Sequence, residues 1–214
     1  MMTGSARRAA WRFLFALAIF AAFAAWAQPL PTAPADLKGP TLIAALRHGG
    51  YILYFRHAAT DFGQNDERMT GYEDCATQRN LTDRGRADAR AIGAALRALT
   101  IPVGDVLASP FCRTMETAQL IFGRATASPA VRGGPAQPES PARYGPLREL
   151  LSTPVPSGTN LAIVSHGNPY RAVVGGAYLT EGEAAVIEPR GKDGFRVVAH
   201  VRLEEWRALE TAPK

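Results

Sequence analysis

Short apolar segments alternate with longer amphipathic segments along most of this chain. Runs of five to eight residues rich in Val, Ile, Leu, Tyr and Phe are typical of buried β-strands. A Gly-Lys-Asp-Gly turn separates the last two runs, which therefore predict a β-hairpin. The expected strands are residues 51–55, 103–108, 160–167, 184–189 and 195–201.

Helices are expected between these strands. The strongest prediction is residues 81–99, in which alanines and leucines recur every four positions and Thr82 or Asp83 can cap the first turn. The other expected helices are residues 42–50, 109–123, 147–152, 169–179 and 203–209. Residues 59–80 are polar and predict a long loop, whereas residues 124–146 give no clear prediction.

This alternation of strands and helices predicts an α/β fold. Strands joined through helices favour a mostly parallel sheet that is covered on both faces. The terminal hairpin adds an antiparallel strand at one edge. We expect one domain over residues 41–214, preceded by a proline-rich linker over residues 28–40.

The N-terminus has the pattern of a secretory signal peptide, expected over residues 1–27. Three arginines precede the apolar run 13–26, and the small residues Ala25 and Ala27 suit cleavage after Ala27. The run is shorter than the roughly 20 residues that cross a bilayer. We therefore expect a secreted or periplasmic bacterial protein, with an uncleaved membrane anchor as the alternative.

Charge and composition narrow the function classes. The formal net charge of +5 falls to +2 on cleavage, because Arg7, Arg8 and Arg12 leave with the signal peptide. The remaining sequence has no basic run with interleaved aromatic residues, so it does not suggest nucleic-acid binding. The cysteine and histidine spacing matches no typical metal site. We expect neither a metal nor a cofactor.

Unusual side chains follow three of the predicted strands. Arg56 and His57 come directly after the first strand, Arg113 shortly after the second, and His166 after the third. In open α/β sheets, ligands bind beyond the carboxyl ends of the strands. We therefore expect these four side chains to share one crevice.

Two guanidinium groups and two imidazoles suit a phosphate group. Arginine offers paired N–H donors to phosphate oxygens, and a neutral imidazole has a lone pair that can attack phosphorus. The second imidazole can donate to the oxygens as charge develops. A single Arg-His pair at a strand end is more often a solvated rim, which is how we interpret His48 and His200. The hypothesis of a phosphate site rests on the occurrence of such residues after three predicted strands together.

The segments FRHAAT, LTDRGRADA, SPFCRTMETA and VSHGN resemble the histidine phosphatase superfamily, also called phosphoglycerate mutase-like. The resemblance covers roughly residues 42–200. Within the superfamily, the sequence looks most similar to secreted bacterial members. The resemblance implies a three-layer α/β/α sandwich and a phosphohistidine intermediate. It also implies that His57 is the nucleophile, that Arg56 and Arg113 bind phosphate, and that His166 is the second pocket histidine.

The chain departs from the family pattern at two points. Ala58 stands where a glycine usually follows the nucleophile. The general acid, commonly a glutamate between the second arginine and the second histidine, has three candidates: Asp61, Glu139 and Glu149. We expect Glu116 to support the helix that carries Arg113 instead.

Cys75 and Cys112 are the two cysteines of the chain. An exported protein meets an oxidising compartment, so we expect a disulfide between them, with two separate buried thiols as the alternative. Such a bond contributes roughly 3–4 kcal/mol at most through the unfolded state. Cysteine-dependent phosphatases resemble one another in having an arginine six positions after the catalytic cysteine. Leu81 and Ala118 stand at those positions here, so this class of phosphatase is disfavoured.

These observations predict a metal-independent phosphomonoesterase. Its partner would be a phosphorylated small molecule or an envelope component, with no nucleic acid and no membrane contact beyond an uncleaved signal segment. Two alternatives remain open. One is a phosphate-binding protein without turnover, and the other is a phosphomutase.

Overall fold

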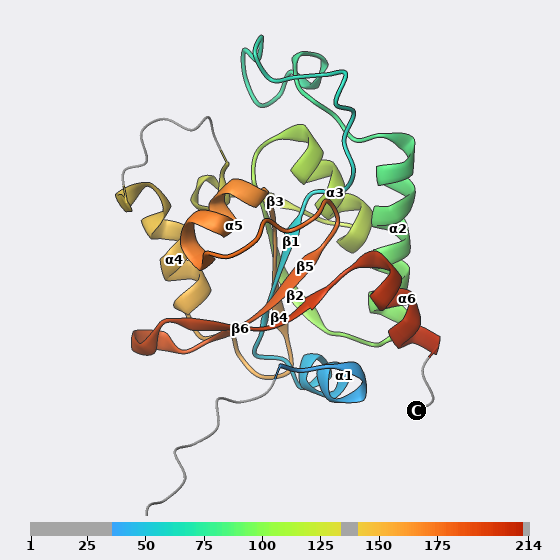
Figure 1. Cartoon of the computed structure of the whole chain (residues 1–214), viewed down its shortest axis with the longest axis vertical. Helices are drawn as coiled ribbons and strands as arrows, with labels where there is room; N and C mark the ends of the chain where they lie inside the picture. The colour runs from blue at the N-terminus through green and yellow to red at the C-terminus, as the bar shows by residue number, and fades with distance from the viewer. Residues whose placement is uncertain (1–35, 134–140, 212–214) are drawn as a thin grey trace, which may run out of the picture. The chain divides into compact units, whose positions relative to one another are not determined.

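The computed structural model describes residues 36–133 and 141–211, and these residues form one mixed β-sheet with helices on both faces (Figure 1). The order of strands across the sheet is β3-β2-β4-β1-β5-β6. The strands are β1 (Ile52–Arg56), β2 (Val103–Ala108), β3 (Thr126–Ala127), β4 (Asn160–Ser165), β5 (Ala184–Pro189) and β6 (Phe195–Val201).

The sheet is mostly parallel, as the sequence predicts. Strands β3, β2, β4 and β1 are parallel neighbours, and Arg56 at the end of β1 pairs in register with Ser165 at the end of β4. Strand β5 runs antiparallel to β1, and β6 runs antiparallel to β5. The carboxyl ends of β1, β2 and β4 therefore meet at one end of the sheet.

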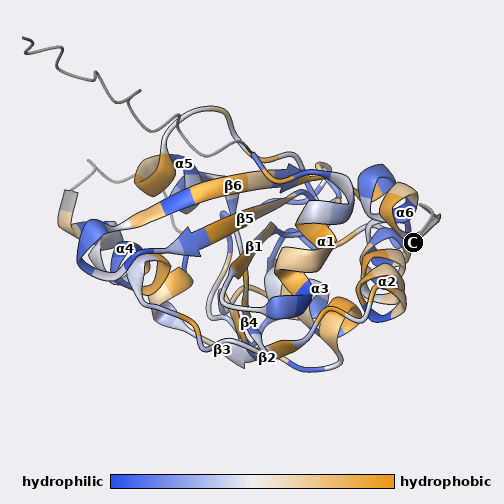
Figure 2. Ribbon diagram, turned by 90° about the horizontal axis from the view of Figure 1, so that it is seen from below, coloured by the Kyte–Doolittle hydropathy of each residue, from blue (hydrophilic) through white to orange (hydrophobic). Residues whose placement is uncertain are grey.

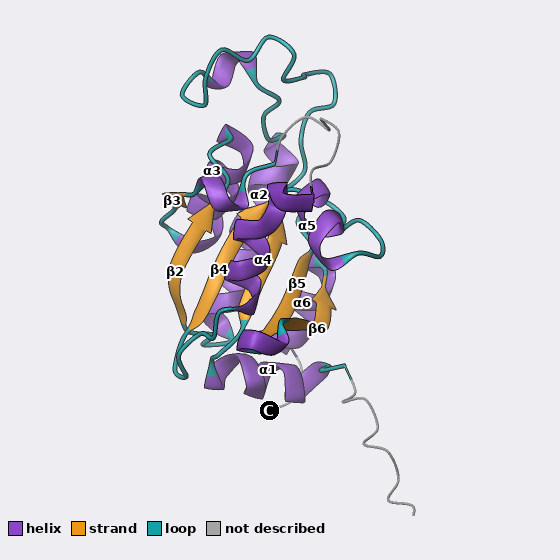
Figure 3. Cartoon of the chain, turned by 90° about the vertical axis from the view of Figure 1, so that its left-hand side faces the viewer, coloured by secondary structure: helices purple, strands orange, loops and turns teal. Residues whose placement is uncertain are grey.

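Helices separate most of the strands along the chain, and Figure 3 shows them (purple) packed beside the sheet (orange). They are α1 (Gly39–His48), α2 (Asp83–Ala98), α3 (Cys112–Phe122), α4 (Gly145–Ser152), α5 (Gly167–Val174) and α6 (Leu203–Thr211). Short 3₁₀ turns are η1 (Cys75–Thr77), η2 (Pro129–Val131), η3 (Pro141–Tyr144) and η4 (Gly191–Asp193). The Thr82 hydroxyl caps α2 by accepting from the backbone N–H of Gly85 at 3.0 Å.

The layers follow from the alternation of side chains along the central strand β1. Leu53 and Phe55 face the helices α1, α2, α3 and α6, whereas Ile52 and Tyr54 face α4 and α5. All four side chains are fully buried. Figure 2 shows the apolar strands between helices whose inner faces are apolar. The three-layer α/β/α sandwich that the family resemblance implies is therefore present.

One local expectation is corrected, and one segment without a prediction is now assigned. The helix predicted over residues 169–179 ends at Val174, because Gly175 and Gly176 both adopt positive φ angles, 84° and 72°, outside the helical region. Residues 124–146, which gave no prediction, contain the short edge strand β3 and two 3₁₀ turns in their described part.

The N-terminal predictions concern residues that the structure describes only in part. The predicted signal peptide, residues 1–27, and the linker residues 28–35 lie outside the described residues. Helix α1 begins at Gly39, within the range assigned to the linker. No helix among the described residues is long and apolar enough to cross a membrane.

Candidate active site

The parallel strands bring the four predicted site residues together. Arg56 is the last residue of β1 and His57 follows it, Arg113 lies in the first turn of α3 after β2, and His166 follows β4. All four line one cavity of about 540 Å³ at the carboxyl end of the sheet. The first turns of α3 and α5 also face this cavity, and the N-termini of helices favour anions.

His57 is buried and held in one orientation. Its ring Nδ1 lies 2.9 Å from the backbone oxygen of Ala58. A carbonyl oxygen can only accept, so Nδ1 carries the proton and Nε2 carries the lone pair. Burial, the largest cause, and the nearby arginine charges lower the pKa of His57 from 6.5 to about 3, although the hydrogen bond to Ala58 raises it. His57 is therefore a neutral imidazole at physiological pH.

His166 lies beside His57, with 5.5 Å between the ring centroids. Its Nε2 is 2.8 Å from the hydroxyl oxygen of Ser109. Burial, followed by the charges of His57 and the arginines, lowers the pKa of His166 well below its usual value. Gly133 packs so closely against the ring that a Cβ at that position would overlap it. The position of His166 is thus set by tight packing as well as by a hydrogen bond.

Arg56 is held from the turn that precedes β5. Its Nη1 donates to the backbone oxygen of Leu179 at 2.8 Å, and its Nη2 lies 3.6 Å from Oε1 of Glu181. The same Glu181 oxygen accepts from the Thr60 hydroxyl at 2.6 Å and lies 3.8 Å from Nδ1 of His57. Burial lowers the pKa of Arg56, yet a guanidinium remains charged in proteins. Glu181 therefore links Arg56 and His57.

Arg113 is almost completely buried, and its charge is balanced by Asp66. Its Nη1 donates to Oδ1 of Asp66 at 3.0 Å, and its guanidinium carbon lies 4.4 Å from the centroid of the Phe111 ring. The Phe111 ring in turn contacts His166, with 5.1 Å between the centroids. One aromatic side chain thus supports two of the predicted site residues.

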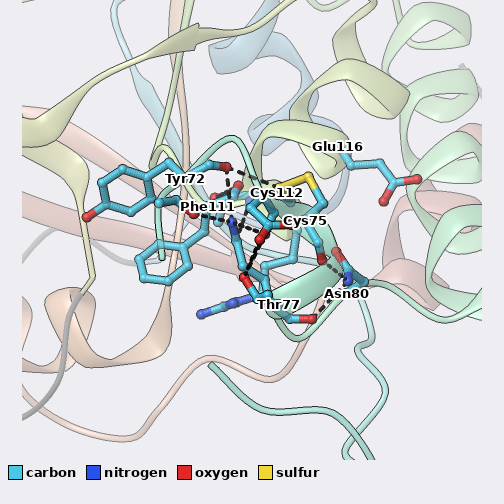
Figure 4. The surroundings of a disulfide bond; sticks show 12 residues. Tyr72, Cys75, Thr77, Asn80, Phe111, Cys112 and Glu116 are labelled. Atoms are coloured by element: carbon cyan, nitrogen blue, oxygen red, sulfur yellow. Dashed lines mark hydrogen bonds between the residues drawn. A yellow bond between two sulfur atoms is a disulfide. The ribbon is translucent and has the colours of Figure 1, made fainter. Parts of the chain in front are cut away.

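A disulfide fixes the loop beside Arg113 (Figure 4). The predicted bond between Cys75 and Cys112 is present, and Cys112 is the residue immediately before Arg113. The Gln78 side chain adds a second tie, because its oxygen accepts from the backbone N–H of Cys112 at 3.0 Å and its amide donates to the backbone oxygen of Tyr72. The long polar loop is therefore anchored at the cavity wall.

That loop brings a third arginine, Arg79, which the sequence did not single out. Arg79 lines the cavity, and its backbone N–H donates to Asp66 at 2.9 Å. Its guanidinium carbon lies 4.9 Å from the centroid of the exposed Phe62 ring. Its Nε is buried without a hydrogen-bond partner.

None of the expected general acids lines the cavity in the described part of the chain. Asp61 is exposed and accepts from the backbone N–H of Gly63, and Glu149 is exposed on α4. Glu139 lies outside the described residues. The carboxylates that line the cavity are Asp66 and Glu67. They lie in the long polar loop, before Arg113 in the sequence. The family pattern instead places the general acid after Arg113, so it gave no reason to expect them.

Glu116 and His200, which the sequence analysis placed outside the site, have structural partners. Glu116 on α3 forms an ion pair with Arg86 on α2, with 2.7 Å between Oε1 and Nε, so it joins these two helices. His200 contacts Glu183 and the Tyr170 hydroxyl at 3.3 Å each. No group of His, Cys, Asp or Glu side chains within the described ranges has the arrangement of a metal site.

The chain is thus an α/β protein with an arginine- and histidine-lined cavity at one end of its sheet, and comparison with known proteins finds a family that it resembles. Residues 52–134 match the model of the histidine phosphatase superfamily, branch 1. The matched segment contains Arg56, His57 and Arg113, three of the four predicted site residues, so this part of the chain is similar to that superfamily. No protein of curated function matches the chain by sequence.

Solved structures share the fold at low sequence identity. The protein histidine phosphatase SixA, solved with tungstate, is 15% identical, with a TM-score of 0.51 over 72% of this chain and 97% of that one. The phosphoserine phosphatase of Entamoeba histolytica is 14% identical, with a TM-score of 0.52 over 70% and 95%. A mycobacterial glucosyl-3-phosphoglycerate phosphatase is 18% identical, with a TM-score of 0.52 over 70% and 97%.

Proposed function

We propose that this protein hydrolyses phosphomonoesters through a phosphohistidine formed on His57. The observation that carries this proposal is the state of His57, a neutral imidazole whose Nδ1 is fixed on the Ala58 oxygen inside an arginine-lined cavity. This geometry leaves the Nε2 lone pair available to a phosphorus atom. The fold shared with several phosphatases supports the same reaction class.

The substrate phosphoryl group would bind between Arg56 and Arg113. Both guanidinium groups are anchored, Arg56 through Leu179 and Arg113 through Asp66, so little ordering is needed when phosphate arrives. Fixed positive charges also stabilise the phosphoryl oxygens in the transition state. The Ser109 hydroxyl can donate to Nε2 of His166, which places the proton of that ring on Nδ1 and makes it a donor to the same oxygens.

The reaction has two steps. In the first, Nε2 of His57 forms a bond to phosphorus, the bond between phosphorus and the ester oxygen breaks, and the alcohol leaves with one proton. In the second, water attacks phosphorus, the bond to Nε2 breaks, phosphate leaves with one proton of that water, and the other proton returns to the group that protonated the alcohol. The carboxylate of Glu181, 3.8 Å from Nδ1 of His57, favours the positive ring of the intermediate.

Glu67 is the proposed donor of the proton to the leaving alcohol. It lines the cavity and forms no ion pair with any residue that the structure describes, whereas the other lining carboxylate, Asp66, is bound to Arg113. Replacement of Glu67 by Gln should slow hydrolysis of an alkyl phosphate by about 10²-fold or more and hardly affect p-nitrophenyl phosphate, whose leaving group needs no proton. If the Glu67→Gln variant affected both substrates equally, water would be the donor of the proton to the leaving alcohol.

Hydrolysis of p-nitrophenyl phosphate with and without EDTA tests the proposed function. We expect release of nitrophenol that EDTA does not affect and that is lost in His57→Ala. Tight phosphate binding without release would instead indicate a binding protein. Transfer of the phosphoryl group to a second hydroxyl of the substrate, with little free phosphate, would indicate a phosphomutase.

We further propose that the protein works outside the cytoplasm on a phosphorylated small molecule or an envelope component. The signal-peptide pattern of residues 1–27 and the disulfide between Cys75 and Cys112 support an exported location. A fusion of residues 1–40 to a reporter that is active only after export tests this placement.

A further inference from the structure

We propose that Arg79 binds a second anionic group on the substrate, so that the preferred substrates are phosphomonoesters whose alcohol part carries a carboxylate or another phosphate. This inference rests on the proposed function of the same cavity. It identifies a specificity-determining residue and the class of substrate that the residue selects.

The first observation is that Arg79 differs from the other arginines of the cavity in its charge balance. Arg113 is paired with Asp66, and Arg56 lies 3.6 Å from Glu181. The Arg79 guanidinium, in contrast, forms no ion pair with a carboxylate among the described residues, and its Nε, like those of Arg56 and Arg113, is buried without a hydrogen-bond partner. A buried donor without a partner is costly, and an incoming anion would relieve that cost.

The second observation is the position of Arg79 relative to the phosphate site. Its backbone oxygen accepts from Nη1 of Arg113 at 3.4 Å, so its backbone lies against the proposed phosphate-binding group. Its guanidinium, however, extends to the ring of Phe62, which is 73% exposed, whereas the Arg113 side chain is 6% exposed. Arg113 therefore lies at the floor of the cavity and Arg79 reaches toward its opening, where the alcohol part of a substrate would lie.

The third observation is that the backbone of Arg79 is held in place. Its N–H donates to Asp66, and the neighbouring Gln78 is fixed to Cys112 and Tyr72 next to the disulfide. An anchored backbone limits the range of distances between this guanidinium and the phosphate site. Such a residue can select substrates by the spacing between two anions.

The electrostatics of the cavity agree with this role. The charge of Arg79 contributes, after burial and other causes, to the lowered pKa values of Arg56, His57, Arg113 and His166. Its field therefore reaches all four predicted site residues. Of the three arginines that line the cavity, Arg56 has Glu181 nearby and Arg113 is paired with Asp66, so Arg79 is the one whose charge no ion pair among the described residues balances.

The test measures binding of phosphonates, which cannot be hydrolysed, so it does not depend on turnover. One pair is phosphonoacetate and 2-hydroxyethylphosphonate, and a longer pair is 4-carboxybenzylphosphonate and 4-hydroxymethylbenzylphosphonate. Each pair differs in whether a carboxylate or a hydroxyl stands at the far end. Calorimetry on the full-length protein should give a Kd about tenfold lower for the carboxylate in at least one pair.

The Arg79→Gln variant should remove this preference by weakening only the carboxylate ligand, and Arg79→Lys should keep part of it. The matched control is Arg132→Gln, because Arg132 is an exposed arginine that donates to the Tyr72 hydroxyl and does not line the cavity. Equal Kd values within both pairs for the wild type would overturn the proposal. So would an equal loss for both ligands in Arg79→Gln, which would place Arg79 on the phosphate itself.

Failure of the proposed function has a different signature. In that case the wild type binds the phosphonates but releases no phosphate from the corresponding esters, 4-carboxyphenyl phosphate and 4-hydroxymethylphenyl phosphate. The ratio of the two Kd values still decides the role of Arg79.

Discussion

The ring of His57 lies 5.5 Å from the ring of His166, although the two residues belong to segments far apart in the sequence. They meet because β1 and β4 are parallel neighbours in register, so that both strands end at the same level. Both rings are buried beside arginines, and burial lowers the pKa of each. The cavity therefore holds a pair of neutral imidazoles side by side.

The first prediction concerns the titration of His57. Because its pKa is lowered to about 3, its ring should stay neutral from pH 8 to pH 5 in the free protein. Nitrogen-15 NMR of labelled imidazoles measures this directly, with His57→Asn to assign the signal. A midpoint near 6.5 for His57 would show that the ring is solvated and would contradict the buried geometry.

The same pKa makes stability depend on pH. A histidine whose folded pKa lies below its unfolded value stabilises the fold above pH 6.5, and this contribution is lost as the pH falls toward 3. The slope is at most about 1.4 kcal/mol per pH unit for each such histidine. Urea unfolding between pH 7.5 and pH 4 should show a steeper loss for the wild type than for His57→Asn. Equal slopes would mean that His57 is not responsible.

Gly133 should be sensitive to the addition of one methyl group. A Cβ at this position would overlap the His166 ring, so Gly133→Ala should displace that ring and lower kcat by about tenfold or more. Gly145→Ala is the matched control, because a Cβ there meets no atom within 4 Å. Similar kcat values for the two variants would show that His166 can move without loss of activity.

Glu181 should affect the chemical step more than binding. Its carboxylate lies near Nδ1 of His57 and accepts from Thr60, so Glu181→Gln should remove charge that favours the phosphohistidine while it leaves a similar shape. We expect kcat to fall about tenfold with a change in KM of less than about threefold. Glu188→Gln is the control, since Glu188 pairs with Arg190 and Arg196 on the terminal hairpin. A rise in KM alone would make Glu181 a binding residue only.

The disulfide should support both stability and the cavity. It joins residues 37 positions apart, and its loss should lower the free energy of unfolding by up to about 4 kcal/mol. A Cys75→Ala, Cys112→Ala double variant, measured by urea unfolding, tests this value. Because Cys112 precedes Arg113, we also expect weaker phosphate binding. Unchanged stability and phosphate affinity would show that the hydrogen bonds of Gln78 are enough to anchor the loop.

The sequence predicts the part of the site that depends on strands. Arg56, His57 and His166 follow apolar runs directly, and Arg113 follows its strand within a few residues, so the parallel sheet fixes where all four lie. To predict which residues lie at this edge of the sheet, only the pattern of hydrophobic residues and the rule that ligands bind at the carboxyl ends of parallel strands are needed.

The rest of the site depends on loops, and their paths are set by contacts that no local pattern reveals. Asp66 and Arg79 reach the cavity because the disulfide and Gln78 fold the long polar loop over Arg113. Glu181 reaches His57 from the turn before β5 through its bond to Thr60. Asp61, which is close to His57 in sequence, is exposed instead. Sequence proximity was therefore a poor guide to the cavity carboxylates.

The central claim is a covalent bond between phosphorus and His57. A rapid-quench experiment with radiolabelled p-nitrophenyl phosphate, stopped in base and followed by peptide mapping, tests it most directly. We predict a label that is stable in base and labile in acid, on the peptide that contains His57, and no label in His57→Asn. A label on another residue, or full turnover by His57→Asn, would contradict the account.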